Sequence, residues 1–185
     1  AGTSHYLRTG FAQAQNIRYQ TDQGDWAFCH TTSFGLSTRM VGGVIMTHGD
    51  DDGLRLPPAI APRQIVIVPM LRDKPEDAEV LAYAKALADE LNELVVFKQA
   101  VRAVVDTKPL KSAEKRWNWV RKGAPLIVEI GPRVAAGGQV TYMRRDALRD
   151  GEKVSMRNAS REDFIAGAAA LLTGIQKALF DEAKA

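Results

Sequence analysis

Residues 32–58 read Thr32-Ser-Phe-Gly-Leu-Ser-Thr-Arg-Met-Val-Gly-Gly-Val-Ile-Met-Thr-His-Gly-Asp-Asp-Asp-Gly-Leu-Arg-Leu-Pro-Pro58, and the rest of the chain is organised around them. Apolar side chains recur through this stretch at Leu36, Met40, Val44 and Met46. Their spacing predicts a mostly buried helix over residues 36–48. The aspartates that begin at Asp50 and the proline pair at Pro57 are expected to end that helix.

Arg39 is the single cation in this apolar run, near the start of the predicted helix. An unpaired guanidinium inside a buried element costs free energy, so we expect an anionic group to meet it. A structural ion pair is the simpler interpretation, and the pattern alone favours it. A ligand phosphate is the second interpretation, and the sequence pattern leaves both open.

A proline-rich linker at residues 56–62 divides the chain into two predicted domains, 1–61 and 62–185. In the first domain, strands are predicted at residues 3–7, 17–20 and 26–32. Two antiparallel strands cannot enclose an apolar helix on all sides. We therefore expect residues 1–61 to be part of a larger domain, and the start of the chain inside a strand pattern suggests missing upstream sequence.

Residues 62–185 show a self-sufficient alternation of strands and helices. Strands are predicted at 64–69, 95–105, 125–130, 137–144 and 153–157, and helices at 75–94, at 112–122 and from Ser160 onward. Ser112 and Ser160 are predicted N-caps of two of these helices. Continuous apolar strands such as 64–69 are typical of a sheet covered on both faces. The alternation predicts a mainly parallel sheet between layers of helices.

Composition excludes several classes of site. The chain has 185 residues, of which 45% are hydrophobic and 25% charged, as in ordinary globular proteins. Cys29 is the only cysteine, so a disulfide framework and a thiolate metal cluster are excluded. The three histidines lack zinc-binding spacing. There is no signal-peptide core and no apolar run of membrane-spanning length, so we expect a cytoplasmic protein.

Positive charge is concentrated in the second domain. The net charge of +3 divides into −1 for residues 1–61 and +4 for the remainder. Residues 98–122 alone hold an excess of six positive charges, which suggests a polyanionic partner, although a solvated helix face is the alternative. Within them, Lys115-Arg-Trp-Asn-Trp-Val-Arg-Lys122 places two indoles among four cations, the combination that binds bases and phosphates. We expect Trp119 to pack inward and Trp117 to contact nucleic acid.

Other motifs are absent or weak. The sequence contains neither Gly-x-Gly-x-x-Gly nor a Gly-Lys-Ser/Thr phosphate loop. The Asp50–Asp52 triplet offers hard oxygen ligands for a divalent cation. Because no ligand spacing supports a metal site, the favoured interpretation of the triplet is a solvated turn after a helix.

Several segments resemble the prolyl-tRNA synthetases of the archaeal/eukaryal-like type, a class II family. The segments similar to the end of the catalytic domain are Gly2–Leu7, Thr32–Arg39, Gly43–Asp51 and Gly53–Pro62. The segments similar to the anticodon-binding domain shared by several class II synthetases are Gln64–Pro69 and Lys122–Pro132. The resemblance covers almost the whole chain.

The resemblance implies an α/β fold. Residues 1–61 would be a partial antiparallel catalytic sheet with the third class II motif. Residues 62–185 would be a complete three-layer α/β anticodon-binding domain with a mixed, mainly parallel sheet. The implied function is that of a ligase of protein biosynthesis, which activates proline with ATP and transfers it to tRNA-Pro. Magnesium and a homodimer are implied for the full-length enzyme, whereas the family's zinc-bearing domain would follow residue 185, so no zinc is expected here.

The resemblance also assigns residues. Thr3 would contact ATP or the adenylate and His5 the proline, while Ser37 and Arg39 would hold ATP. Arg39 would act catalytically by stabilising charge on the phosphate. The implied tRNA-binding residues are Arg116, Trp117, Arg121 and Lys122.

The sequence departs from the family at other positions. Arg8, Thr31 and Phe34 are unusual, and the expected base-reading residues of the anticodon domain are replaced by Arg116, Val120 and Ile127. Two hypotheses follow. The chain is a C-terminal portion of a prolyl-tRNA synthetase that does not activate proline alone, since the second class II motif lies upstream. Alternatively, it is a free-standing module that binds tRNA or a protein.

Overall fold

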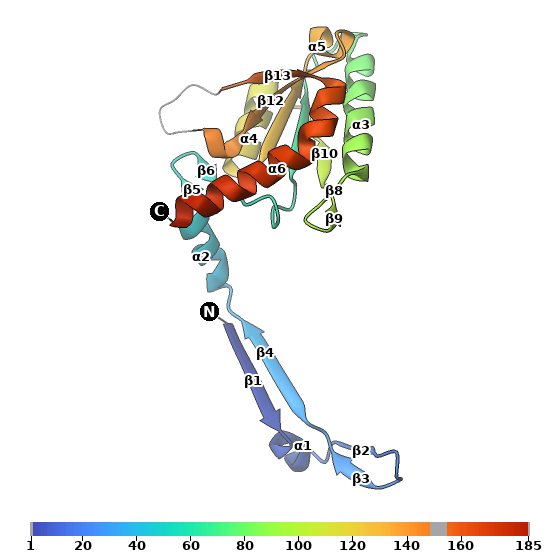
Figure 1. Cartoon of the computed structure of the whole chain (residues 1–185), viewed down its shortest axis with the longest axis vertical. Helices are drawn as coiled ribbons and strands as arrows, with labels where there is room; N and C mark the ends of the chain where they lie inside the picture. The colour runs from blue at the N-terminus through green and yellow to red at the C-terminus, as the bar shows by residue number, and fades with distance from the viewer. Residues whose placement is uncertain (1, 149–154, 185) are drawn as a thin grey trace. The chain divides into compact units, whose positions relative to one another are not determined.

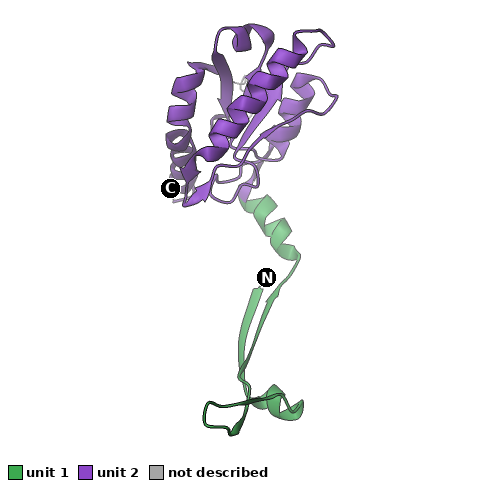
Figure 2. Cartoon of the chain, turned by 90° about the vertical axis from the view of Figure 1, so that its right-hand side faces the viewer, with its two compact units in different colours: residues 1–47 green, residues 48–185 purple. Residues whose placement is uncertain are grey.

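The structure is a computed structural model that describes residues 2–148 and 155–184. It divides into two compact units, residues 1–47 and 48–185 (Figure 2). Contacts therefore separate the chain ahead of the proline-rich linker. The assignment of residues 1–61 and 62–185 to two domains stays a prediction.

The first unit consists of two antiparallel ribbons and two helices. Its elements are β1 (Gly2–Arg8), α1 (Gly10–Ala14), β2 (Arg18–Gln20), β3 (Trp26–Phe28), β4 (Thr31–Leu36) and α2 (Arg39–His48). β1 pairs with β4, and β2 pairs with β3. The sequence predicted β1 and β2. It did not separate β3 from β4, because the apolar pattern runs through both.

The prediction of a mostly buried helix over residues 36–48 is wrong for the described chain. α2 begins at Arg39, none of its residues is buried, and Leu36 belongs to β4 and is 83% exposed. The physical reason is geometric, because two-stranded ribbons in this unit supply no second layer wide enough to cover an apolar helix. The apolar spacing identified the helix correctly but not its burial.

The second unit is built on a mixed five-stranded sheet in the order β10-β7-β11-β12-β13 (Figure 1). The strands are β7 (Ile65–Pro69), β10 (Ala103–Val105), β11 (Leu126–Ile130), β12 (Gln139–Arg144) and β13 (Arg157–Ser160). β10, β7 and β11 are parallel, whereas β12 and β13 are antiparallel. The predicted parallel alternation therefore holds for the first three strands of this sheet.

Helices cover both faces of this sheet. They are α3 (Asp77–Glu93), α4 (Ser112–Arg121), α5 (Pro132–Ala136) and α6 (Arg161–Lys184). Ile65 and Ile67 of β7 pack in one cluster with side chains of α3 and α6. Val66 and Val68 of the same strand pack in a second cluster with Val120 of α4. Because successive strand residues point to opposite faces, both faces of β7 are buried and its sequence is continuously apolar.

Smaller elements join these layers. They are the hairpins β5 (Gly49–Asp50) with β6 (Gly53–Leu54) and β8 (Val95–Val96) with β9 (Gln99–Ala100), and a 3₁₀ turn at Arg145–Ala147. The predicted strand over 95–105 is thus broken, because Phe97 and Lys98 adopt φ values of 53° and 62° and reverse the chain. The predicted strand at 153–157 lies largely outside the described residues.

The two predicted helix caps have different outcomes. Ser160 Oγ accepts a hydrogen bond of 3.0 Å from the Asp163 amide, so the predicted N-cap of α6 is confirmed. Ser112 is the first residue of α4, and the cap position, Lys111, makes no side-chain cap hydrogen bond. The N-cap prediction for Ser112 is therefore wrong, and a solvated lysine precedes the helix instead.

By length and composition alone, α6 could cross a membrane, although the sequence had suggested no such run. Core helices of water-soluble proteins often share this composition. One face of α6 is buried in the sheet cluster, through Phe164, Ala168, Leu172 and Ile175. This packing favours the interpretation that α6 is a core helix.

Two glycines allow the β5–β6 hairpin to pack backbone to backbone on the end of α4. A Cβ atom at Gly53, whose φ is 128°, would lie 2.4 Å from Arg121 Cα. A Cβ atom at Gly123, whose φ is 74°, would lie 2.8 Å from Leu54 Cβ. Neither position has room for a side chain, so the hairpin and the helix end have one closely fitted arrangement.

We expect Gly53→Ala and Gly123→Ala each to lower the free energy of unfolding by at least about 2 kcal/mol, because a left-handed backbone with a Cβ costs about 1–2 kcal/mol and the facing backbone must also move. Urea unfolding measures the change. Gly138→Ala is the matched control, since Gly138 has a φ of 60° and nothing within 4 Å of its added Cβ. Equal losses for all three variants would show that the close approach is unimportant.

Candidate nucleic-acid interface

α4 positions the aromatic and basic residues that the sequence singled out. Its apolar side faces the sheet through Val120, which is fully buried. Trp117 is 37% exposed, and Arg121 and Lys122 at the end of the helix are also exposed. Gly123 then ends the helix in a left-handed conformation, as expected for a helix C-terminus.

Two of the four cations in this segment are used internally. Lys115 is only 1% exposed, and its Nζ donates a hydrogen bond to the Asp106 carbonyl oxygen at 3.1 Å. Arg116 Nη1 donates to Glu129 Oε1 at 2.9 Å, and Glu129 is buried. The basic face of α4 is therefore narrower than the sequence implied, because a charge count does not show which cations pair within the fold.

Trp119 is held inward, as predicted. Its Nε1 donates a hydrogen bond of 2.7 Å to Asp106 Oδ2, and Asp106 is buried. The Lys122 ammonium lies 4.7 Å from the centre of the indole ring, within range of a cation–π interaction. The anchored Trp119 ring thus fixes one side of Lys122, while Trp117 offers the more accessible aromatic surface.

A pocket of about 470 Å³ adjoins these residues within the second unit. It is lined by Leu54, Leu56, Pro62, Arg63, Trp119, Lys122 and Ala124. The lining is mainly apolar, and both of its charged side chains are cations. Such a surface suits a flat apolar group that bears negative charge nearby.

The positions where the sequence departs from the expected base-reading residues lie in the core. Val120 and Ile127 are both fully buried in the cluster between α4 and the sheet. Side chains in that cluster do not reach solvent, so they contact no base in this arrangement.

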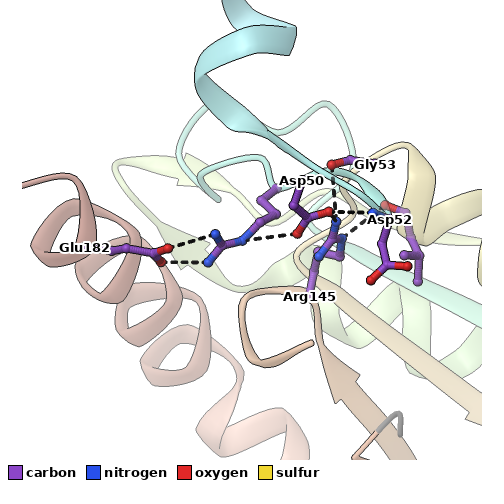
Figure 3. A network of polar contacts seen from close by, with 7 residues as sticks. Asp50, Asp52, Gly53, Arg145 and Glu182 are labelled. Carbon is purple, nitrogen blue, oxygen red and sulfur yellow. Dashed lines mark hydrogen bonds and ion pairs between the residues drawn. The ribbon is translucent and has the colours of Figure 1, made fainter. Parts of the chain in front are cut away.

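A buried ionic network behind α4 was not foreseen (Figure 3). Arg145 is 1% exposed and forms an ion pair with Asp50. Its Nε donates to the Val120 carbonyl oxygen at 3.2 Å, and its Nη2 donates to the Gly53 carbonyl oxygen at 3.3 Å. Arg145 Nη1 has no partner among the described residues. The interpretation of the aspartate triplet as a solvated turn is therefore wrong for Asp50, whose sequence neighbours gave no indication of a partner 95 positions away.

Arg55 extends this network to α6. Its two terminal nitrogens bond the two carboxylate oxygens of Glu182 at 2.9 and 2.7 Å, and its Nε lies 3.7 Å from Asp50 Oδ2. The hydrogen bond to Glu182 raises the pKa of Arg55, and the charges of Glu182 and Asp50 act in the same direction, although burial opposes them. The β5–β6 hairpin is thus tied by charge both to the turn after β12 and to the end of α6.

Burial raises the pKa of the Asp50 carboxyl group, but the hydrogen bond and charge of Arg145 act in the opposite direction. The Asp52 amide, which donates to Asp50 Oδ1 at 3.0 Å, and the charge of Arg55 add to this effect. The net result is a pKa below the ordinary value of 3.8. Asp50 is therefore ionised throughout the neutral range.

The residues predicted to contact ATP and proline lie in the first unit. Thr3 pairs with Gly35 and His5 with Ser33 in the β1–β4 ribbon, and the odd-numbered positions of β1 share one face. Ser37 lies between β4 and α2, and its Oγ accepts a hydrogen bond of 3.3 Å from the Arg39 amide. The ribbon thus brings Thr3 and His5 together, whereas no contact joins them to Ser37 or Arg39 among the described residues.

Arg39 is exposed, contrary to the expectation that it lies in a buried element. Its guanidinium forms no ion pair among the described residues, because exposure removes the energetic requirement for one. In the part of the chain that the structure describes, no group of three or more His, Cys, Asp or Glu side chains could hold a metal ion.

Comparisons with known proteins agree on one family. The anticodon binding domain family matches residues 64–166. The proline–tRNA ligase of Sphingopyxis alaskensis is 58% identical over 185 residues, which cover 100% of this chain and 35% of that protein. The proline–tRNA ligase of Novosphingobium aromaticivorans is 54% identical over 186 residues, which cover 100% of this chain and 36% of that protein. The chain therefore spans about a third of the length of these relatives.

Solved structures give the same indication. The prolyl-tRNA synthetase from Cryptosporidium parvum, complexed with halofuginone and AMPPNP, superposes with a TM-score of 0.68 at 28% sequence identity. The similarity covers 100% of this chain and 35% of that one.

We expect Asp50→Asn to lower the free energy of unfolding of the second unit by about 2–4 kcal/mol. Removing one partner of a wholly buried ion pair costs about 3–5 kcal/mol, and the Asp50 side chain keeps 18% of its surface exposed. Asp51→Asn is the matched control, with an expected change within about 0.5 kcal/mol, because Asp51 is exposed and outside the network. Urea unfolding at neutral pH compares them.

The same pair predicts a pH dependence. Because the pKa of Asp50 is lowered in the folded state, its stabilisation is fully present above its unfolded pKa near 3.8 and is lost as the pH falls through the lower folded value. The stability difference between the unaltered chain and Asp50→Asn should therefore shrink below about pH 4. A difference that stays constant down to pH 2 would contradict the assignment.

Proposed function

The chain belongs to the anticodon-binding domain family, and we propose that residues 62–185 bind tRNA-Pro as part of a proline–tRNA ligase. The observation that most directly supports the binding role is the end of α4, where Trp117, Arg121 and Lys122 are exposed together beside an apolar pocket. The whole-length match to relatives named as proline–tRNA ligases supports the identity of the amino acid.

The proposed contacts follow from the chemistry of single-stranded RNA. An unpaired base stacks on an exposed indole, which Trp117 offers, and phosphate oxygens accept hydrogen bonds from guanidinium and ammonium groups, which Arg121 and Lys122 supply. Arg116 completes the proposed set. Its ion pair with Glu129 leaves it half-buried, so we assign it a smaller share of the affinity.

In the first unit, we propose that Thr3 contacts ATP or the adenylate, that His5 contacts proline and that Ser37 and Arg39 hold ATP. Two observations support this. Thr3 and His5 lie on one face of β1, and the Arg39 guanidinium, which forms no ion pair among the described residues, is available for bidentate hydrogen bonds to a phosphate. Its positive charge would stabilise the charge that develops on the α-phosphate during attack by the proline carboxylate.

The proposed reaction joins proline to ATP with release of pyrophosphate, and the prolyl group then passes to tRNA. Magnesium is expected for the longer enzyme, but the described residues do not provide its ligands, and no step is derived through it. A homodimer of the longer protein and a cytoplasmic location are further parts of the proposal. A free-standing binding module is the second hypothesis, and the relatives do not favour it.

We expect Trp117→Ala to weaken binding of tRNA-Pro by about 1–3 kcal/mol because base stacking is removed, and to reduce its preference over other tRNAs. Arg121→Gln and Lys122→Gln should each reduce the slope of log K against log salt by about 0.7–0.9, without changing that preference. Filter binding at several salt concentrations measures both. Lys177→Gln on α6 is the control for removal of a surface charge, because Lys177 is 74% exposed and remote in sequence from α4. Binding without any tRNA preference would favour the module hypothesis.

We also expect residues 1–185 alone to give no proline-dependent pyrophosphate exchange, because Ser37 and Arg39 supply only some of the contacts that activation requires. The assay measures incorporation of labelled pyrophosphate into ATP with and without proline. Robust exchange that depends on Arg39 would show that this chain is sufficient for activation.

A further inference from the structure

We propose that Asp50 and Arg145 are positioning residues for RNA binding, because together they hold the β5–β6 hairpin against the end of α4 from which Arg121 and Lys122 project. The proposal rests on the proposed function, since it assumes that these two cations contact RNA. It assigns a role in recognition to a hairpin outside the α4 sequence motif.

The first step is the backbone contact between hairpin and helix. Gly53 lies against the Arg121 backbone, and Gly123 lies against Leu54, each too closely for a Cβ atom. Arg121 and Lys122 therefore lie between two points at which the hairpin touches the main chain. A displacement of the hairpin would change the backbone direction at both cations.

The second step is the bond from Arg145 to the helix terminus. The last carbonyl groups of a helix lack partners within the helix and carry partial negative charge. Val120 lies in the last turn of α4, and its carbonyl oxygen accepts hydrogen bonds from Arg145 Nε and from the Gly123 amide. A single buried guanidinium thus binds both the end of α4 and the Gly53 carbonyl oxygen of the hairpin.

The third step concerns accessibility. Arg145 is 1% exposed, so it cannot itself donate hydrogen bonds to RNA. Asp50 is an anion and would repel phosphate. Any effect of these two residues on RNA affinity therefore acts through the residues they position (Figure 3). Lys122 is fixed on its other side by the Trp119 ring, so the hairpin and the anchored indole together restrict where its ammonium group lies.

The test compares tRNA binding by folded protein. Asp50→Asn and Arg145→Lys, measured at low temperature where circular dichroism shows full folding, should bind tRNA-Pro about two- to thirtyfold more weakly. Their salt slopes should also fall by about 0.9 for each phosphate that is no longer neutralised. Arg145→Lys keeps the charge but lacks the planar fork that bonds several acceptors at once. Glu90→Gln is the control, because it breaks the Glu90–Arg161 ion pair of 2.7 Å elsewhere in the unit and should leave binding unchanged.

The outcomes separate the two proposals. If the unaltered chain does not bind tRNA, the proposed function fails. If the chain binds and Lys122→Gln weakens binding, but folded Asp50→Asn and Arg145→Lys bind with unchanged affinity and salt slope, the positioning role is overturned. If Asp50→Asn does not fold, Arg145→Lys and Asp50→Glu, which retain the charges, decide the matter by the same two measurements. Rescue of Asp50→Asn affinity by added salt would also contradict positioning, because salt weakens phosphate contacts.

Discussion

The buried guanidinium of Arg145 is the constraint on which one end of the second unit depends. Removing a charge from water costs several kcal/mol, and the cost is offset only when hydrogen-bond geometry is good. Asp50 and two backbone carbonyl oxygens supply that geometry, while Nη1 is left without a partner among the described residues. Such a pair contributes little net stability compared with apolar packing. Its consequence is specificity, because only one placement of the hairpin satisfies the charge.

The opposite face of α4 follows the same principle. Lys115 and Trp119 both bond to Asp106, one to its carbonyl oxygen and the other to its carboxylate, and Arg116 bonds to the buried Glu129. These contacts fix the helix against the sheet by direction as well as by area. The residues left exposed on α4 and just after it are then Trp117, Arg121 and Lys122, and the stacking and charge that RNA requires are concentrated in a small, rigid surface.

Sequence reasoning succeeded where the information was local. The apolar period of α3 and α6, the continuous apolar strands β7 and β11, and the cap at Ser160 all follow from neighbouring residues. It failed where the deciding partner is distant. Nothing near Asp50 indicates Arg145, and a lysine in a basic run, such as Lys115, gives no sign that it is buried. The helix α2 was found from its period, but its burial depends on a covering layer, which a period cannot report.

The contrast between Arg39 and Arg145 shows why burial of a cation is hard to infer. Apolar neighbours suggested that Arg39 is buried and needs an anion, yet it is exposed. The expected pairing of a buried guanidinium with an anion does occur, but between Arg145 and the aspartate that was thought only to end a helix. Because Asp50 is committed to Arg145 and Arg55, it does not neutralise Arg39. The Arg39 guanidinium keeps its positive charge available for a phosphate, which is the property that the proposed nucleotide contact requires.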